Sequence, residues 1–242
     1  MSKSGMTFRP YPGMTIACAV LFAVLCWLGV WQLERLQWKL ALIATVNGHM
    51  TAAPVTLDQI AAMPTDQAQY RRVILHGRFD HAKEDYVFTT DASGAPVYHV
   101  LTPLLTDSGK TLMVDRGAVP KEKLDPASRA AGNVAGEVAV TGVWRAPDAP
   151  GLFTPAPDLS KRVWYARDLA GMAAADRITL SQAALVEADA TPNPGGLPKG
   201  GQTVVSFRNE HLSYAVTWFG LAIMLLGVWF SYQISKGRIA FK

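Results

Sequence analysis

Cysteine is scarce in this chain of 242 residues, and both cysteines lie inside one apolar run. With only Cys18 and Cys26 present, the sequence has no disulfide framework and no CxxC pattern for a metal or a redox pair. Their spacing of eight residues puts the two roughly on one face of a helix. We therefore interpret them as small buried hydrophobic residues.

The sequence also lacks the motifs of the common enzyme classes. GxSxG, HExxH, the P-loop and GxGxxG are all missing, and no pattern groups the Ser, His and Asp residues. The net charge is only +4, and no basic run is interleaved with aromatic residues. We therefore expect a protein that is not an enzyme and that binds no nucleic acid.

Long runs without charge are what the chain does contain. No charged residue occurs from Leu212 to Gln233, and residues 14–33 form a second apolar run. About 20 residues at a rise of ~1.5 Å cross a ~30 Å hydrocarbon layer, so both runs are predicted to be transmembrane helices in a lipid bilayer. A cleaved signal peptide is the alternative for the first run. That run is longer than an h-region and continues into Trp27 and Trp31 without a small-x-small site, so we expect it to be retained.

Basic residues flank both short ends of the chain. The head carries Lys3 and Arg9, and the tail carries Lys236, Arg238 and Lys242 without an acid. The positive-inside rule then places both ends in the cytoplasm. The head is too short for a transit peptide, so we expect a multi-pass protein of the bacterial plasma (inner) membrane with its main domain in the periplasm. The expected parts are a cytoplasmic head (1–13), a transmembrane helix (14–33), an extracytoplasmic β-rich domain (34–210), a transmembrane helix (211–232) and a cytoplasmic tail (233–242).

The segment between the apolar runs changes from helical to strand periodicity. Helical spacing predicts a helix that ends at Asn47-Gly48. Thr56-Leu57-Asp58-Gln59 resembles a capping box, and Asp168 is expected to cap a helix over Leu169–Ala175. Alternation with period two predicts strands at Tyr70–Phe79, Tyr86–Thr90, Val97–Leu105, Thr111–Val119, Glu137–Arg145, Ala184–Ala190 and Thr203–Phe207.

Short turns between these strands favour antiparallel neighbours. The expected fold class is therefore an α+β membrane protein. Its two transmembrane helices, N-in and C-in, bracket one extracytoplasmic antiparallel β-barrel or sandwich with short helices.

A histidine at the entrance of the second apolar run is the main candidate site residue. An ionisable side chain at a membrane span is a functional hypothesis by default, and the neutral imidazole of His211 is a suitable axial ligand for haem iron. Tyr214 and Trp218 lie on or near its helix face, where Ala215 and Ala222 would leave space for a flat macrocycle. The alternative is a histidine that only anchors the helix in an interfacial aromatic belt.

Further candidates for the same site lie on the first apolar run. Trp27, Trp31 and Trp38 fall on one helix face with Arg35 between them, and arginine is the usual partner of a carboxylate such as a haem propionate. The alternative is that Glu34 and Arg35, at the end of the first run, only form ion pairs with Arg208 or Glu210 at the start of the second.

Charged motifs of the middle segment have structural interpretations. Arg116 is expected to fix a turn or to form an internal ion pair, and Trp164-Tyr165-Ala166-Arg167-Asp168 is expected to supply packing aromatics and a helix cap. Three histidines fall on or near predicted strands. Without cysteines or a dense carboxylate cluster beside them, we expect no metal site at His76, His81 or His99. Haem iron is the only metal that we expect this protein to bind.

Several motifs in this order resemble the Surfeit locus protein 1 family. They span about Gly29 to Leu221, most of the chain, and the last of them is the most specific. One departure is Ala118, where the family more often carries tryptophan. The motifs are Gly29-Val30-Trp31-Gln32-Leu33-Glu34-Arg35-Leu36-Gln37-Trp38-Lys39, Tyr70-Arg71-Arg72-Val73, Tyr98-His99-Val100-Leu101-Thr102-Pro103-Leu104, Val114-Asp115-Arg116-Gly117-Ala118-Val119-Pro120, Trp164-Tyr165 and Asn209-Glu210-His211-Leu212-Ser213-Tyr214-Ala215-Val216-Thr217-Trp218-Phe219.

The resemblance implies an assembly factor for haem–copper terminal oxidases, chiefly cytochrome c oxidase, that is not an enzyme. Members are thought to bind haem a transiently and to aid its insertion into subunit I. The implied iron ligand is His211, and Tyr214, Trp218, Trp31 and Arg35 are implied only as pocket residues. The expected partners are cytochrome c oxidase subunit I, haem a synthase and the lipid bilayer.

Two other functions remain open at this point. The first is a haem-independent, membrane-anchored scaffold that docks on subunit I or on the haem synthase. The second is an extracytoplasmic hydrolase, which a clustered Ser/His/Asp or metal site in the folded domain would favour. A Soret band in the purified protein would distinguish the carrier from the scaffold.

Overall fold

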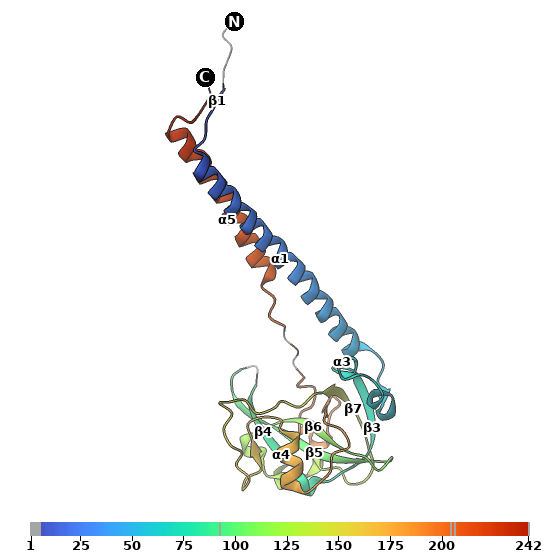
Figure 1. The fold of residues 1–242 in the computed structure, drawn as a ribbon. Helices are drawn as coiled ribbons and strands as arrows, with labels where there is room; N and C mark the ends of the chain where they lie inside the picture. Colours follow the sequence, from blue (N-terminus) through green and yellow to red (C-terminus); the bar gives the residue numbers. More distant parts are fainter. Residues whose placement is uncertain (1–5, 92, 204, 206, 242) are drawn as a thin grey trace. The chain divides into compact units, whose positions relative to one another are not determined.

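A computed structural model describes residues 6–91, 93–203, 205 and 207–241 of the chain. The chain divides into two compact units. The first contains Met1–Ala44 and Ser206–Lys242, and the second contains Thr45–Val205. Figure 1 shows the long helices of the first unit in blue and red, and the strands of the second in colours from teal to orange.

Two long helices make up most of the first unit. Helix α1 runs over Pro12–Thr51 and helix α5 over His211–Ser235. Both are long and apolar enough to cross a membrane, with a mean hydropathy of 2.3 and 1.7 over their most apolar windows. The sequence predicted an end at Asn47-Gly48, but α1 continues through it, and the residues after Ala44 belong to the second unit. A glycine inside a helix costs only about 1 kcal/mol, which neighbouring turns can offset.

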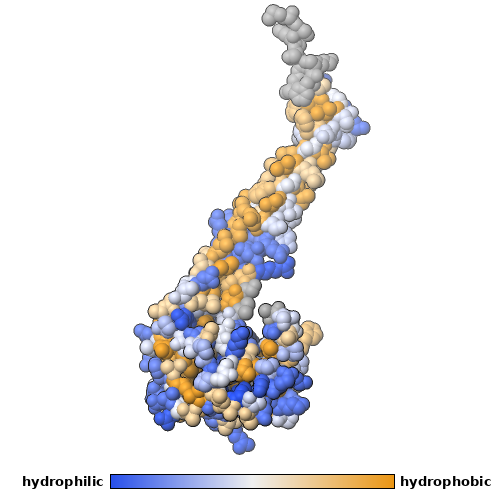
Figure 2. All heavy atoms as spheres, turned by 180° about the vertical axis from the view of Figure 1, so that it is seen from behind, coloured by the Kyte–Doolittle hydropathy of each residue, from blue (hydrophilic) through white to orange (hydrophobic). Residues whose placement is uncertain are grey.

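The two helices lie side by side and antiparallel (Figure 1). Trp229 Nε1 near the end of α5 donates to Thr15 Oγ1 near the start of α1 at 3.3 Å. Beyond them, strand β1 (Met6–Phe8) pairs antiparallel with strand β10 (Ile239–Phe241), so the segments that flank the two helices are hydrogen-bonded to each other. Hydrophobic side chains cover the helix pair (Figure 2), which gives it the surface of a membrane-spanning element.

A closed ring of five strands forms the second unit. Its strand order is β3–β7–β9–β6–β5, and β5 pairs back to β3, so the sheet closes on itself. Strand β4 pairs with the first half of β5, before the residues that pair with β3, and the two-residue strands β2 and β8 pair with β3 and β4. The ring strands are β3 (Arg72–Phe79), β5 (Pro96–Thr106), β6 (Thr111–Pro120), β7 (Val138–Arg145) and β9 (Leu185–Ala188); the others are β4 (Asp85–Thr90), β2 (Val55–Thr56) and β8 (Val163–Trp164).

The strand positions confirm most of the sequence prediction, with two corrections. The sheet is mixed, because β6 and β9 run parallel although their other ring neighbours are antiparallel. Parallel strands need a crossover, and helix α4 (Leu169–Asp176) lies in the connection between β8 and β9. The described part of Thr203–Phe207, residues 203, 205 and 207, contains no strand, although the alternation there predicted one.

Predicted helix starts in this unit are confirmed. Helix α2 (Leu57–Ala61) begins with a complete capping box between Thr56 and Gln59, and Asp168 caps α4 by accepting from Gly171 N at 3.0 Å. A third short helix, α3, spans Thr65–Ala68.

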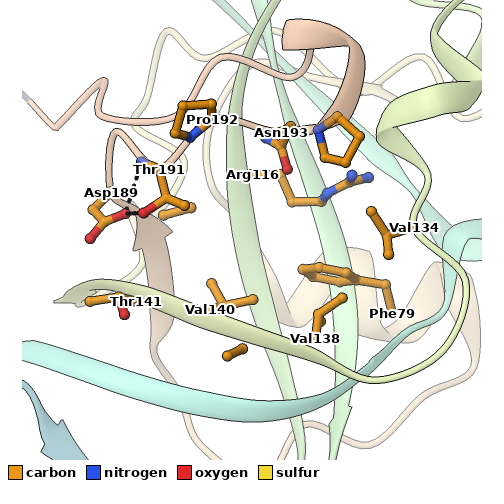
Figure 3. Close-up of a pocket in the computed structure, with 13 residues that line it drawn as sticks. Phe79, Arg116, Val134, Val138, Val140, Thr141, Asp189, Thr191, Pro192 and Asn193 are labelled. Carbon is orange, nitrogen blue, oxygen red and sulfur yellow. Dashed lines mark hydrogen bonds between the residues drawn. The ribbon is translucent and has the colours of Figure 1, made fainter.

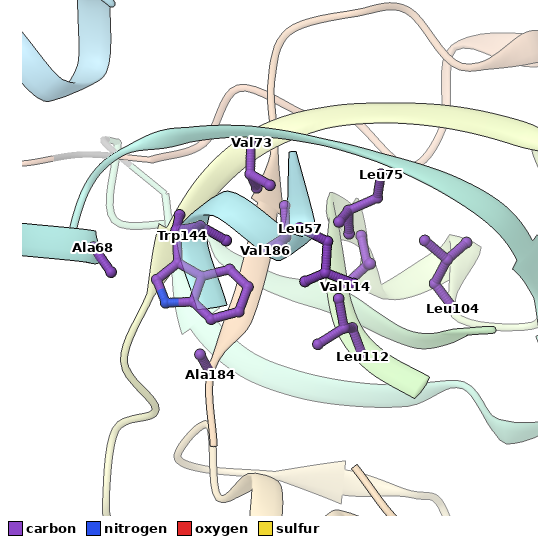
Figure 4. Packing of buried hydrophobic residues seen from close by; sticks show 11 residues of the cluster. Leu57, Ala68, Val73, Leu75, Leu104, Leu112, Val114, Trp144, Ala184 and Val186 are labelled. Carbon is purple, nitrogen blue, oxygen red and sulfur yellow. The ribbon is translucent and has the colours of Figure 1, made fainter. Parts of the chain in front are cut away.

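The barrel interior is an apolar core. Its members come from α2, α3, the five ring strands and the residue before β9, and Figure 4 shows their side chains converging. Gly77 allows the ring to close, because a Cβ there would overlap the Leu105 carbonyl oxygen of the paired strand β5. The core residues are Leu57, Ile60, Ala68, Val73, Leu75, Leu104, Leu112, Val114, Trp144, Ala184 and Val186.

Candidate functional site

Helix α5 begins at His211, the residue singled out by the sequence. Glu210 caps the helix with its backbone only, and its side chain accepts from Arg208 Nε at 2.7 Å. Both charged side chains are open to solvent and neutralise each other. His211 therefore stands at the start of an apolar helix, and the charges of Arg208 and Glu210 just before it are paired with each other.

A single short hydrogen bond fixes the His211 ring. Its Nδ1 lies 2.7 Å from Oε1 of Gln32 on helix α1. Because an amide oxygen can only accept a hydrogen bond, Nδ1 carries the proton. The second ring nitrogen, Nε2, has no partner among the described residues. The imidazole is thus held through Nδ1, and in its neutral form the other nitrogen, Nε2, is the unprotonated one.

Close packing surrounds this hydrogen bond. The Phe219 ring of α5 occupies the place of a side chain at Gly29 of α1, since a Cβ there would lie 2.6 Å from Phe219 Cζ. Ala215 and Ala222 are 1% and 2% exposed. The expectation that these alanines leave space for a macrocycle is wrong: they are covered, as small residues at a close helix–helix contact are.

The other residues of the candidate pocket differ in exposure. Trp218 is half-buried, whereas Tyr214 and Trp31 are 52% and 45% exposed. The guanidinium of Arg35 stacks over the ring of Trp38 at 4.2 Å. Within the described chain, no hydrogen bond, ion pair or ring contact joins any of these side chains to His211.

The alternative ion pairs, of Glu34 and Arg35 with Arg208 or Glu210, are not found among the described residues. Arg208 pairs with Glu210, as described above, but among the described residues neither Glu34 nor Arg35 forms an ion pair. Both side chains are exposed, so the charge of Arg35 is accessible from solvent.

Arg116 forms the internal ion pair that its sequence context predicted. Its Nη1 donates to Glu84 Oε1 at 2.9 Å, and Arg129 Nη2 donates to Glu84 Oε2 at 2.6 Å. All three side chains are almost completely buried. Burial lowers the pKa of the Arg116 guanidinium, and the charge of Glu84 opposes that shift. A buried carboxylate held between two arginines is a structural element.

Beside this triad lies an apolar cavity of about 230 Å³ (Figure 3). Its walls include Phe79, Val138 and Val140, and the Arg116 guanidinium sits 4.9 Å above the Phe79 ring. Arg116 is engaged with Glu84, a carboxylate that it shares with Arg129.

A second buried network contains His99. Its Nδ1 lies 2.7 Å from Asp115 Oδ2, and Arg167 bridges Asp115 and Glu187. Burial alone would raise the pKa of Asp115, but the hydrogen bond and charge of His99, together with the charge of Arg167, hold it below its usual value. The described residues contain no group of three side chains that could hold a metal ion.

Sequence reasoning missed Gln32. From the sequence, Gln32 was named only as a member of a longer motif. Its place on the helix would have distinguished it. On α1 the covered positions recur every three or four residues, and Gln32 is a strongly polar side chain among them, only 9% exposed. A polar side chain on the covered face of an apolar helix indicates a specific partner.

Comparison with known proteins gives a consistent result. The family model described as "SURF1 family" matches residues 19–223. The chain is similar to "Surfeit locus protein 1" of Takifugu rubripes, with 37% identity over 88% of this chain and 93% of the relative. It is also similar to "Surfeit locus protein 1" of Homo sapiens, 37% identical over 84% and 72%, and to "SURF1-like protein" of Drosophila melanogaster, 37% identical over 88% and 75%.

Proposed function

Because the chain belongs to the SURF1 family, we propose that it is an assembly factor for a haem–copper terminal oxidase that binds haem a and aids its insertion into subunit I. In this role haem a is cargo, and His211 is the iron ligand. The partners are oxidase subunit I, which receives the cargo, and haem a synthase, which supplies it.

The observation that carries this proposal is the state of the His211 ring. A neutral imidazole binds iron through an unprotonated nitrogen. Here Nδ1 is protonated and engaged, while Nε2 has no partner among the described residues. The donor therefore suits iron. Ala215 and Ala222 are covered, so the macrocycle would lie on the outer surface of the helix pair, where Tyr214 is exposed.

The two apolar helices support a membrane anchor, and we assign it to the bacterial plasma membrane. Lys236 and Arg238 follow α5, and Arg9 precedes α1, with no acid at either end. The positive-inside rule places these ends in the cytoplasm and the barrel in the periplasm. Under this topology His211 lies where the second helix leaves the outer leaflet. The hydrophobic macrocycle would then remain in lipid while His211 binds its iron.

Single-histidine ligation suits a carrier, because cargo must also be released. The side chains of the second unit do not support a second function as well as His211 supports haem binding. The described residues bring no Ser, His and Asp together in a nucleophilic arrangement, since the acid beside His99 is tied to Arg167.

The test is the haem content of the full-length protein purified in detergent from cells that make haem a. The wild type is expected to show a Soret band, and His211→Ala is expected to lose most of it. The matched control is His76→Ala, because His76 is exposed on a strand of the second unit. Equal haem content in wild type and His211→Ala would refute the ligand assignment. A wild type that copurifies with subunit I but carries no haem would establish the scaffold instead.

A further inference from the structure

We propose that Gln32 is a positioning residue for the iron ligand: its amide oxygen selects the His211 tautomer that is protonated on Nδ1 and aims Nε2 outward for coordination. This inference rests on the proposed function, since it concerns the same histidine. It adds a residue on the other helix, so that the two helices together define the site.

The geometry assigns this role to one atom. Gln32 Oε1 accepts from His211 Nδ1 at 2.7 Å, a short distance for a neutral pair. Free imidazole exchanges between two tautomers, of which only one leaves Nε2 able to bind a metal. An acceptor on Nδ1 removes the other tautomer and fixes the ring plane. Histidine ligands of metals usually have such a partner on the second nitrogen.

The surroundings keep Gln32 in place. It is covered on the contact face of α1, one turn after Gly29, where the Phe219 ring packs against the helix backbone. A polar side chain in such an apolar contact is costly unless it is hydrogen-bonded. The His211 contact satisfies its oxygen, so the same bond that orients the ring also joins the helices at this level.

The chemical nature of the partner also matters. His99 in the second unit has a carboxylate at the same 2.7 Å distance, whereas His211 has a neutral amide. A carboxylate draws the Nδ1 proton more strongly and makes Nε2 a stronger donor to a metal. The amide of Gln32 gives a weaker donor, which suits cargo that must later leave.

The experiment is a haemin titration of the detergent-solubilised full-length protein, followed by the Soret band, the ferric electron paramagnetic resonance spectrum and the midpoint potential. Gln32→Leu removes the acceptor and is expected to weaken binding about 10–100-fold, the usual effect of losing such a partner. It should also broaden the resonance spectrum, since the ring is no longer fixed. Gln32→Glu keeps an acceptor, so it should retain binding and move the potential to more negative values.

Gln37→Leu is the matched control, because Gln37 is an exposed glutamine on the same helix with no side-chain hydrogen bond among the described residues. It is expected to behave as the wild type. If Gln32→Leu binds haemin with wild-type affinity and spectrum, the inference is wrong. If Gln32→Leu does not fold, the potential of Gln32→Glu decides: an unchanged potential overturns the inference. A wild type that binds neither haemin nor haem a overturns the proposed function itself, which is a distinguishable result.

Discussion

Replacement of Glu84 tests how the barrel domain is held together. This carboxylate accepts from two arginines, Arg116 at 2.9 Å and Arg129 at 2.6 Å, and its side chain is only 2% exposed. Tyr86 also lies within hydrogen-bond distance of both Glu84 and Arg129. In Glu84→Ala two guanidinium groups would stay buried without a counter-charge, close to each other.

The size of the effect follows from that geometry. Removing one partner of a buried ion pair costs about 3–5 kcal/mol, because the remaining charge is left desolvated. In a domain of this size each kcal/mol lowers Tm by roughly 2–4 °C. Glu84→Ala is therefore expected to lower the Tm of the barrel by about 6–20 °C, measured by calorimetry or near-UV circular dichroism of the full-length protein.

Glu137 provides the matched control. It forms an ion pair with Arg78 at 3.0 Å, but the two side chains are 69% and 67% exposed. Exposed pairs contribute roughly 0–1 kcal/mol, so Glu137→Ala should lower Tm by a few degrees at most. If Glu84→Ala melts no lower than Glu137→Ala, the buried triad does not stabilise the barrel and the reasoning is refuted.

Two further perturbations test other parts of the molecule. Gly29→Ala should destabilise the helix pair by about 1–3 kcal/mol, because the added Cβ overlaps the Phe219 ring. Gly227→Ala is the control and should not destabilise the pair, because an added Cβ there meets no atom within 4 Å. Equal melting temperatures of the two variants would contradict the contact between Gly29 and Phe219. Burial raises the pKa of Asp85 from 3.8 to about 6. The folded protein thus holds this proton more tightly than the unfolded chain, so stability falls as pH rises from about 4 to about 6. Asp85→Asn, which keeps an acceptor for Trp164, should lack this loss, and a pH-independent Tm difference from wild type would disprove the assignment.

The local structure of the barrel was largely predictable. Strand β6 was predicted at Thr111–Val119 and spans Thr111–Pro120, because alternating side chains and flanking turns mark both of its ends. The cap at Asp168 was equally clear, since its short side chain accepts a backbone N–H of the first turn. Such features depend on residues close in sequence, so the sequence contains the information needed to locate them.

Closure of the sheet was not predictable in the same way. The pairing of β3 with β5 and the parallel register of β6 and β9 join segments far apart in the chain. Neither alternation nor turn length encodes which distant edges meet. The misplaced end of α1 has a different cause: Asn47-Gly48 is a frequent helix stop, but here Ala52 N still bonds to Gly48 O, so the helix overrides it.

The candidate site shows the same division between local and distant information. His211 was identifiable from its position at the start of an apolar run. Its partner Gln32 is 179 residues away, and only the pairing of the helices brings the two together. The expectation for Ala215 and Ala222 failed for the same reason. Spacing shows that the two alanines share a helix face, but not whether a ligand or the other helix covers that face.

Among the described histidines, His49, His81, His99 and His211 each have a hydrogen-bonded ring, and the chemical nature of the partner separates His99 from His211. His99 lines one cavity together with Arg145, Arg167 and Glu187, whose charges are paired with one another, and its ring is tied to the Asp115 carboxylate. The charged residues just before His211 in the chain, Arg208 and Glu210, pair with each other. A buried imidazole tied to a carboxylate inside an ion-pair network stabilises a fold. An imidazole tied to a neutral amide, at the end of an apolar helix, keeps its second nitrogen available for a ligand.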